Sequence, residues 1–158
     1  MTSVRMRAKA ERQSASKPSR ESPRRKKDAC VRIKRVYEPP GHEDGARILV
    51  DRLWPRGVAK ARAEIDLWLP DVAPSTELRR RLHAAPLGEA AAWSSFQADY
   101  ALELEREPAR TAANVLLRRM ARGPITLLYA AREEAHNNAV ALKAWLTAHA
   151  DKEVGERG

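Results

Sequence analysis

The sequence contains only one cysteine, one phenylalanine and seven glycines among its 158 residues. The single cysteine, Cys30, excludes an internal disulfide and a cysteine-rich metal site. It is typical of a protein in the reducing cytoplasm, where we expect this one to reside. The sequence has no run of about 20 apolar residues, so we expect neither a membrane span nor a membrane partner. The basic start of the chain is not followed by an apolar stretch, which predicts that it is not a secretory signal peptide.

Common catalytic and cofactor motifs are also absent from the sequence. It contains no Gly-x-Gly-x-x-Gly, no Walker loop, no Gly-x-Ser-x-Gly and no His-x-x-x-His. The four histidines, at positions 42, 83, 136 and 149, are too scattered to indicate a metal site. The sequence therefore predicts no metal site, assigns no cofactor and leaves open whether the protein is an enzyme.

The net charge of +9 is concentrated at one end of the chain. Residues 1–30 hold ten Lys/Arg and three Asp/Glu, which leaves 20 against 18 for residues 31–158. The first segment is rich in Ser, Arg, Lys and Pro and lacks aromatic residues, so it cannot bury enough apolar surface to offset its conformational entropy. We expect a disordered basic tail over residues 1–29, one domain over 30–150 and a frayed C-terminus over 151–158. The tail favours either weak, non-specific nucleic-acid binding or a solubilising role.

Apolar periodicity and turn residues predict an alternation of strands and helices. Strands are predicted over residues 31–37, 46–53 and 125–131. Helices are predicted over residues 59–64, from 74–77 onward, around 93–104, over 109–122 and up to about 149. This alternation predicts an α/β fold, with a small, mostly parallel sheet flanked by helices in a Rossmann-like three-layer arrangement. Trp68, Trp93 and Trp145 are predicted to lie in its core.

A first cluster of candidate site residues follows the strand that is predicted to end near Val50, and it comprises Asp51, Arg52, Trp54 and Arg56. Ligands of open α/β sheets bind beyond the carboxyl ends of the strands. Arg52 and Arg56 can bind a phosphate or carboxylate through paired hydrogen bonds, or they can pair with nearby acids of the chain. Asp51 is a candidate general base or a loop cap, and Trp54 either stacks on a ligand ring or belongs to the core.

A second cluster follows the last predicted strand and comprises Tyr129, Arg132, His136, Asn137 and Asn138. Asparagine is a favoured helix cap, and the free amides of a helix start attract anions, so these residues either cap the last helix or bind a ligand. His136 is a candidate acid or base, and Tyr129 and Arg132 are candidate ligand contacts. We expect the two clusters to form one polar site for a small anionic or nucleotide-like ligand. The alternative is a non-catalytic interaction module.

Three segments of the sequence resemble a known family: RVYEPP with DGARILVDRLWPRG, APSTELRR, and ITLLYAAREEAHNNAVALK. Over residues 31–148 the chain resembles the YeaO-like branch of the DUF488 family of bacterial proteins. The resemblance implies a compact α/β domain and no established activity. Other branches carry a cysteine-rich turn, LLCAE followed by HCHR, after the last strand. Here Tyr129 stands in place of the first cysteine and Asn137, Asn138 and Ala139 occupy the HCHR-like stretch, so the resemblance implies no thiol or metal chemistry.

Overall fold

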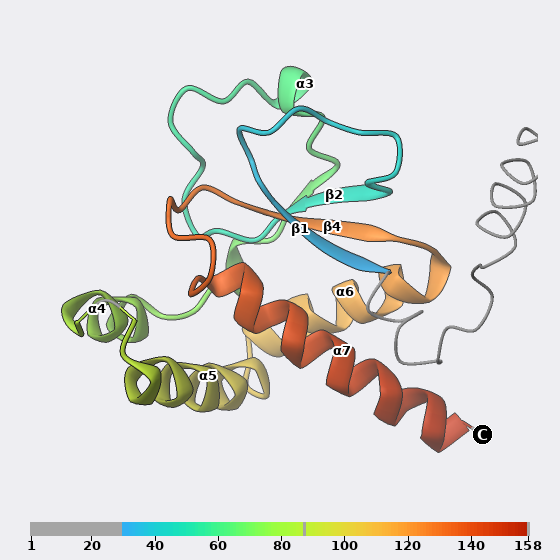
Figure 1. Ribbon diagram of the computed structural model, residues 1–158. Coiled ribbons are helices and arrows are strands. Elements are labelled where there is room, and N and C mark those ends of the chain that lie inside the picture. Colours follow the sequence, from blue (N-terminus) through green and yellow to red (C-terminus); the bar gives the residue numbers. More distant parts are fainter. Residues whose placement is uncertain (1–29, 87, 158) are drawn as a thin grey trace, which may run out of the picture.

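The computed structural model describes residues 30–86 and 88–157 (Figure 1), and the tail predicted over residues 1–29 lies outside them. The strands are β1 (Val31–Arg35), β2 (Ala46–Leu49), β3 (Leu67–Trp68) and β4 (Ile125–Tyr129). The helices are α3 (Lys60–Ala63), the 3-10 helix η1 (Pro70–Val72), α4 (Thr76–Ala84), α5 (Ala90–Leu104), α6 (Ala109–Arg122) and α7 (Asn138–Arg157). None of the helices in the described ranges combines the length and apolar character that a bilayer crossing requires.

The strands of the described residues form one parallel sheet in the order β1-β4-β2-β3. Ile125 of β4 lies opposite Val31 of β1 on one side and Ala46 of β2 on the other. Every residue of β4 is buried, because this strand has a neighbour on each side and packed side chains on each face. Since all pairs are parallel, the carboxyl ends of β2 and β4 lie at the same edge of the sheet.

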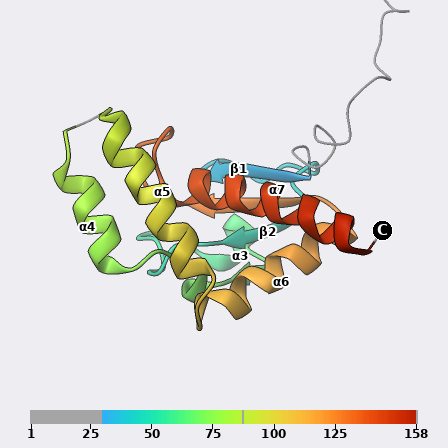
Figure 2. The same cartoon turned by 90° about the horizontal axis from the view of Figure 1, so that it is seen from below.

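Helices α6 and α7 cover one face of the sheet, and α3 lies on the other (Figures 1 and 2). Successive residues of a strand point to opposite faces. Ile48 and Leu127 therefore join the main core with α5, α6 and α7, while Leu49 and Leu128 join a smaller cluster with Ala63 of α3. The predicted α/β fold is confirmed, with a thin third layer on the α3 side.

Helices α4 and α5 form a hairpin beside the carboxyl edge of the sheet (Figure 2). The Tyr100 hydroxyl donates to the Val72 carbonyl at 2.5 Å, and the Ser75 amide donates to the Glu103 carboxylate at 2.9 Å. The Ser75 hydroxyl accepts from the Leu78 amide at 3.2 Å and caps α4, as the hydroxyl ahead of this helix predicts. These contacts fix the hairpin to the chain that leaves η1.

The largest differences from the prediction are in β2, β3 and α7, while β1 and β4 each end two residues before their predicted ends. Strand β2 ends at Leu49, because the chain bends from Asp51 onward. The two-residue strand β3 was not predicted, and as the edge strand it leaves Trp68 39% exposed, so the core position predicted for this residue is wrong. Helix α7 continues to Arg157, beyond its predicted end near His149.

Candidate ligand-binding site

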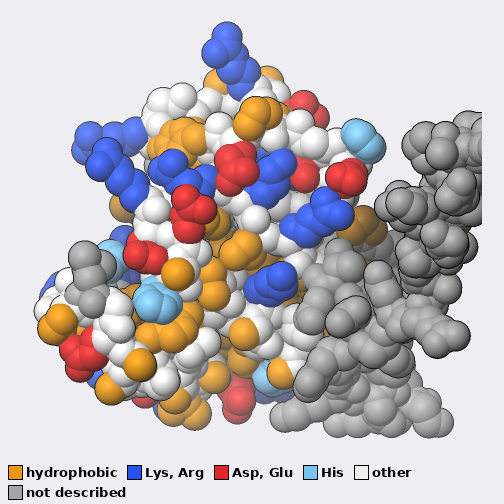
Figure 3. Space-filling model, viewed as in Figure 1, with side chains coloured by type: hydrophobic (Ala, Val, Ile, Leu, Met, Phe, Trp, Pro, Cys, Tyr) orange, Lys and Arg blue, Asp and Glu red, His pale blue; other side chains and the backbone are white. Residues whose placement is uncertain are grey.

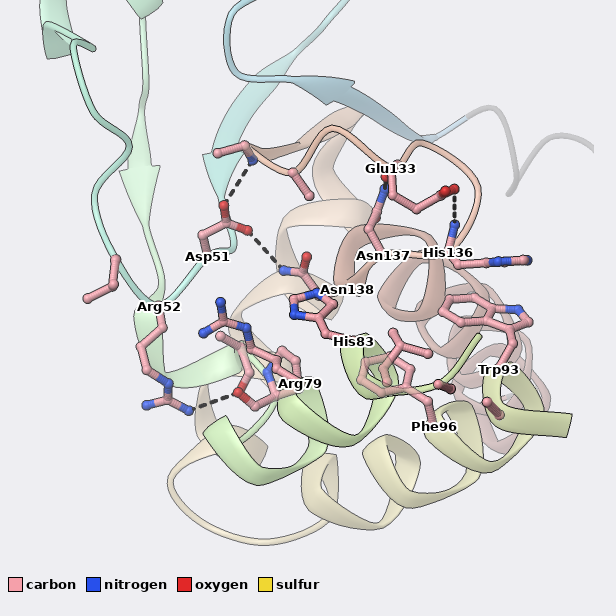
Figure 4. Close-up of a pocket in the computed structure, with 18 of the residues that line it drawn as sticks. Asp51, Arg52, Arg79, His83, Trp93, Phe96, Glu133, His136, Asn137 and Asn138 are labelled. Carbon is pink, nitrogen blue, oxygen red and sulfur yellow. Dashed lines mark hydrogen bonds between the residues drawn. The ribbon is translucent and has the colours of Figure 1, made fainter. Parts of the chain in front are cut away.

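A cavity of about 610 Å³ lies where the carboxyl ends of β2 and β4 meet the α4–α5 hairpin (Figure 4). Its wall is mainly apolar, and hydrophobic side chains gather over α4, α5 and the start of α7 in the space-filling view (Figure 3). The charged, histidine and asparagine residues of the lining are Asp51, Arg52, Arg79, His83, Glu89, Glu133, His136, Asn137 and Asn138. The volume is within the range of roughly 300–1,000 Å³ that small-molecule sites occupy.

Asp51 joins the ends of β2, β4 and α7 through its carboxylate. Its Oδ2 accepts from the Ala130 amide at 2.9 Å, and its Oδ1 accepts from Asn138 Nδ2 at 3.0 Å. Burial raises the pKa of the Asp51 carboxyl above its ordinary value, although these hydrogen bonds and the charge of Arg79 act in the opposite direction. Each carboxylate oxygen therefore has one hydrogen-bond partner within the fold.

The turn between β4 and α7 is held by its own polar groups. Asn137 is buried, its Oδ1 accepts from the Val140 amide at 2.9 Å, and its Nδ2 donates to the Glu133 carbonyl at 2.8 Å. The Glu133 carboxylate accepts from the amides of Ala135 at 2.7 Å and His136 at 3.1 Å, and these bonds lower its pKa. The asparagine that precedes α7 thus caps the helix, which is one of the two roles predicted for it.

Arg52 is hydrogen-bonded to the backbone of the segment that precedes α4. Its Nη2 donates to the carbonyls of Ala73 at 3.4 Å and Pro74 at 3.2 Å, and no ion pair joins it to an acid within the described ranges. The side chain is exposed and lines the cavity. Its remaining N–H groups are accordingly able to reach an anion at the mouth of the cavity.

An aromatic group forms one wall of the cavity. The ring of Trp93 lies 4.8 Å from the ring of His136 and 5.6 Å from that of Phe96, measured between centroids. Phe96 continues the row to Tyr100, whose centroid is 5.8 Å away. His136 is half-buried, and its ring packs against that of Trp93 in the wall of the cavity (Figure 4). Such a wall suits a flat ring better than a hydrated ion.

Two nitrogen-bearing side chains of α4, Arg79 and His83, face the cavity (Figure 4). They lie four residues apart and therefore on one side of the helix, and both are exposed. Within the described part of the chain, neither side chain makes a hydrogen bond or an ion pair that would occupy its donors. Arg79 is close enough to Asp51 for its charge to lower the pKa of that carboxyl.

Both predicted clusters contribute to this cavity. It is lined by Asp51, Arg52 and Trp54 from the first cluster, and by His136, Asn137 and Asn138 from the second. Arg56, Tyr129 and Arg132 do not line it. Arg56 and Arg132 are exposed elsewhere, whereas Tyr129 is buried within the sheet and burial raises the pKa of its hydroxyl.

Sequence reasoning missed Arg79, His83, Trp93, Phe96 and Glu133 as lining residues. Trp93 was predicted to be core. It packs against the core and is half-buried, but it also forms part of the cavity wall. The available signal was the spacing of Arg79 and His83 along one side of α4, next to the side that carries Leu78. In the part of the chain that the structure describes, no three His, Cys, Asp or Glu side chains are grouped so that they could hold a metal ion.

Comparison with known proteins places the chain in a family. Residues 30–157 match the family described as the inactive DUF488-N3 subclade, DUF488-N3i. The chain is 39% identical over 118 residues to the uncharacterised protein YeaO of Escherichia coli (strain K12), covering 73% of this chain and 96% of YeaO. It is 36% identical over 116 residues to an uncharacterised protein of Mycobacterium tuberculosis, covering 73% of this chain and 92% of that protein. No solved structure gives a significant match.

Proposed function

This chain belongs to the DUF488 family, and we propose that it binds a small anionic, nucleotide-like molecule in the cavity without converting it chemically. The description of the matching subclade as inactive agrees with binding rather than catalysis. The proposal gives His136 and Arg52 contact roles, and it makes Asp51, Asn137 and Asn138 positioning residues.

The observation that carries this proposal is that the polar side chains after β2 and β4 are hydrogen-bonded within the fold. A side chain whose polar atoms are hydrogen-bonded within the fold is fixed in place and positions its neighbours. Both oxygens of Asp51 accept hydrogen bonds from Ala130 and Asn138, and both ends of the Asn137 amide are bonded within the turn. These hydrogen bonds hold the floor of the cavity in shape, which supports the assignment of Asp51 and Asn137 as positioning residues.

The remaining lining indicates the kind of ligand. Trp93, Phe96 and His136 offer an apolar, aromatic wall for a flat ring, and Arg79 and His83 offer donors for an anionic group. The guanidinium of Arg79 beside a mainly apolar cavity suits a molecule with one ring and one phosphate or carboxylate. A mononucleotide has this combination.

Calorimetric titration of the full chain with AMP, adenosine and inorganic phosphate tests the proposal. We expect AMP to bind most tightly, and Arg79→Gln to weaken AMP binding by about tenfold or more, since a charge-assisted hydrogen bond contributes about 1.5–3 kcal/mol. Arg80→Gln is the matched control, because Arg80 is the next residue of α4, is exposed and does not line the cavity.

Three outcomes count against the proposal. If none of the three probes binds the wild-type chain, the small-molecule role is wrong and the non-catalytic interaction module remains. If Arg79→Gln and Arg80→Gln lower the affinity for AMP equally, the effect is a general one of charge and not recognition in the cavity. If chromatography after incubation finds AMP converted to a product, the non-catalytic part of the proposal is wrong.

A further inference from the structure

We propose that the nucleotide bound in the cavity is one residue of a single-stranded nucleic acid, and that residues 52–63 bind the part of the strand that leaves the cavity. The inference rests on the proposed function, because it makes the cavity the site of one nucleotide. Residues 52–63, called the 52–63 segment below, follow β2 and end with α3 (Figure 1).

The 52–63 segment begins in the wall of the cavity. Residues 52–55 line the cavity, and residues 56–63 do not. Leu53 is 71% exposed, which is the highest value among the large hydrophobic side chains of the described ranges. A ligand that is longer than the cavity therefore passes over Leu53 and reaches the rest of the segment.

The charge of the segment suits a polyanion. It contains four basic residues and no acidic one, and all four are exposed: Arg52, Arg56, Lys60 and Arg62. Within the described part of the chain, none of them forms an ion pair with an acid. The other residues between 31 and 158 include two more acidic than basic side chains. The segment is thus a local source of positive potential that starts at the cavity.

Two exposed aromatic rings flank the segment. Trp68 is 39% exposed, and its Nε1 donates to the Asp51 carbonyl at 2.8 Å, just before the segment begins. Tyr37 is half exposed, and its hydroxyl donates to the Arg56 carbonyl at 3.3 Å. Basic side chains that follow the backbone, together with aromatic rings on which bases stack, are the combination that binds single-stranded nucleic acid.

The first half of the segment is held in one shape. Trp54 Nε1 donates to the Val58 carbonyl at 2.8 Å and so closes the turn between these two residues. The ring of Trp54 also packs edge-on against that of Trp68, with 5.4 Å between the centroids. Because the turn is already ordered, a bound strand does not have to pay the entropy of fixing it.

Single-stranded nucleic acid fits this surface better than a membrane or an acidic peptide. A membrane-binding surface needs a continuous apolar side that enters the lipid. Here the exposed residues after Leu53 are arginine, lysine, glycine and alanine, so charges interrupt the apolar surface. An acidic peptide would pair with the basic residues but would leave the aromatic wall at Trp93 and Phe96 without a flat ring to contact.

Fluorescence anisotropy of the full chain with labelled oligo(dA) and oligo(A) of about 12 nucleotides, at several KCl concentrations, tests this inference. We expect both to bind more tightly than AMP, and the tighter of the two shows whether the strand is DNA or RNA. Each phosphate contact of a single strand contributes about 0.7 to the slope of log K against log salt. We expect Arg56→Gln with Lys60→Gln to flatten the slope by about 1.4, so that the loss of affinity between 50 and 200 mM salt shrinks roughly sevenfold.

The matched control is Arg118→Gln with Arg122→Gln. It removes the same charge from exposed residues of α6, which covers the face of the sheet away from α3 (Figure 1). We expect this control to keep nearly the wild-type slope. Thermal melts of every variant show that it folds.

Two further variants test the stacking and the cavity separately. We expect Trp68→Leu to weaken oligonucleotide binding about fivefold or more and to leave AMP affinity unchanged, because Trp68 does not line the cavity. We expect Arg79→Gln to weaken the binding of both AMP and the oligonucleotides, since the same cavity holds a nucleotide in each case.

The outcomes separate this inference from the proposed function. If AMP binds but the oligonucleotides bind no more tightly, the inference is wrong and the proposed function stands. If neither binds, both are wrong. Equal slopes in the two double variants, or oligonucleotide binding that Arg79→Gln does not change, also overturn the inference. So does binding of polyglutamate or of phosphatidylglycerol vesicles that is as tight as binding of the oligonucleotides.

Discussion

Asn138, in the first turn of α7, donates a hydrogen bond from Nδ2 to Asp51 Oδ1 at 3.0 Å and lies within 3.2 Å of the Val50 carbonyl. The two residues are 87 positions apart in the sequence, and their contact closes the floor of the cavity. The Ala130 amide donates to the other oxygen of the same carboxylate. One carboxylate therefore holds together the ends of β2 and β4 and the start of α7.

Replacing Asn138 with Ala removes the donor while Asp51 stays half-buried. We expect Asn138→Ala to lower the free energy of unfolding by about 1–3 kcal/mol, because a buried acceptor is left without a partner. Urea denaturation measures this loss. Asn114→Ala is the matched control, since Asn114 is an exposed asparagine of α6, and it should leave stability within about 0.5 kcal/mol of wild type. Equal effects of both changes would contradict the structural role of Asn138.

The pH dependence of stability reports on Asp51. Burial raises the pKa of this carboxyl, against the hydrogen bonds from Asn138 and Ala130 and the charge of Arg79. A carboxyl whose folded pKa exceeds its unfolded value of about 3.9 contributes stability at pH values below 3.9. That contribution is lost as the pH rises through the folded pKa. We therefore expect the stability of the wild type relative to Asp51→Asn to fall as the pH rises from 3 to 7 in urea titrations. A relative stability that increases with pH would mean that the pKa is lowered.

The meeting of the two clusters could be predicted because it follows from strand direction. The polar residues after β2 and after β4 both lie at carboxyl ends, and neighbouring parallel strands end at the same edge. The contact of Asp51 with Asn138 is a direct result. The sequence pattern does not predict in which direction the side chains of each turn point. Arg56 and Arg132 were therefore predicted at the site, although they do not line the cavity.

The α4–α5 wall could not be predicted in the same way. Helical periodicity identifies the apolar side of α4 through Leu78, but it does not say that the neighbouring side, with Arg79 and His83, faces a cavity. Arg79 and His83 therefore had the pattern of an ordinary solvated face. Trp68 lies in a short apolar patch over residues 67–69, which predicts a core position, and a strand of two residues is too short to reveal by alternation which side chains are exposed.

A substitution of Arg52 tests whether this residue only holds the backbone before α4 or also contacts the ligand. Its Nη2 donates to the carbonyls of Ala73 and Pro74, and lysine retains the charge but loses the planar fork. Because the side chain is exposed, we expect Arg52→Lys to lower stability by less than about 1 kcal/mol in urea titrations. We expect AMP affinity in calorimetry to fall by more in Arg79→Gln than in Arg52→Lys. A larger loss of stability together with unchanged AMP affinity would show that Arg52 only holds the backbone before α4.

The ion pair of Asp44 with Arg47 gives the largest expected loss of stability. Both side chains are 4% exposed, and the carboxylate lies 2.5 Å from Arg47 Nη1 and 3.1 Å from Lys34 Nζ. Asp44→Asn leaves a buried guanidinium without its counter-charge, so we expect a loss of about 3–5 kcal/mol in the free energy of unfolding. Glu43→Gln is the control, because the exposed pair with Arg32 at 3.8 Å contributes about 1 kcal/mol at most.

The same ion pair predicts how stability changes in acid. Burial alone would raise the pKa of Asp44, but hydrogen bonds from Gly41, Lys34 and Arg47 outweigh burial and hold it below the ordinary value. A lowered folded pKa contributes stability above the unfolded value of about 3.9, and that contribution is lost as the pH falls through the folded pKa. The difference in stability between wild type and Asp44→Asn should therefore shrink in urea titrations from pH 5 downward. A difference that stays constant to pH 2 would show that the charge of Asp44 contributes nothing, and the loss in Asp44→Asn would then come from altered hydrogen bonding in the loop.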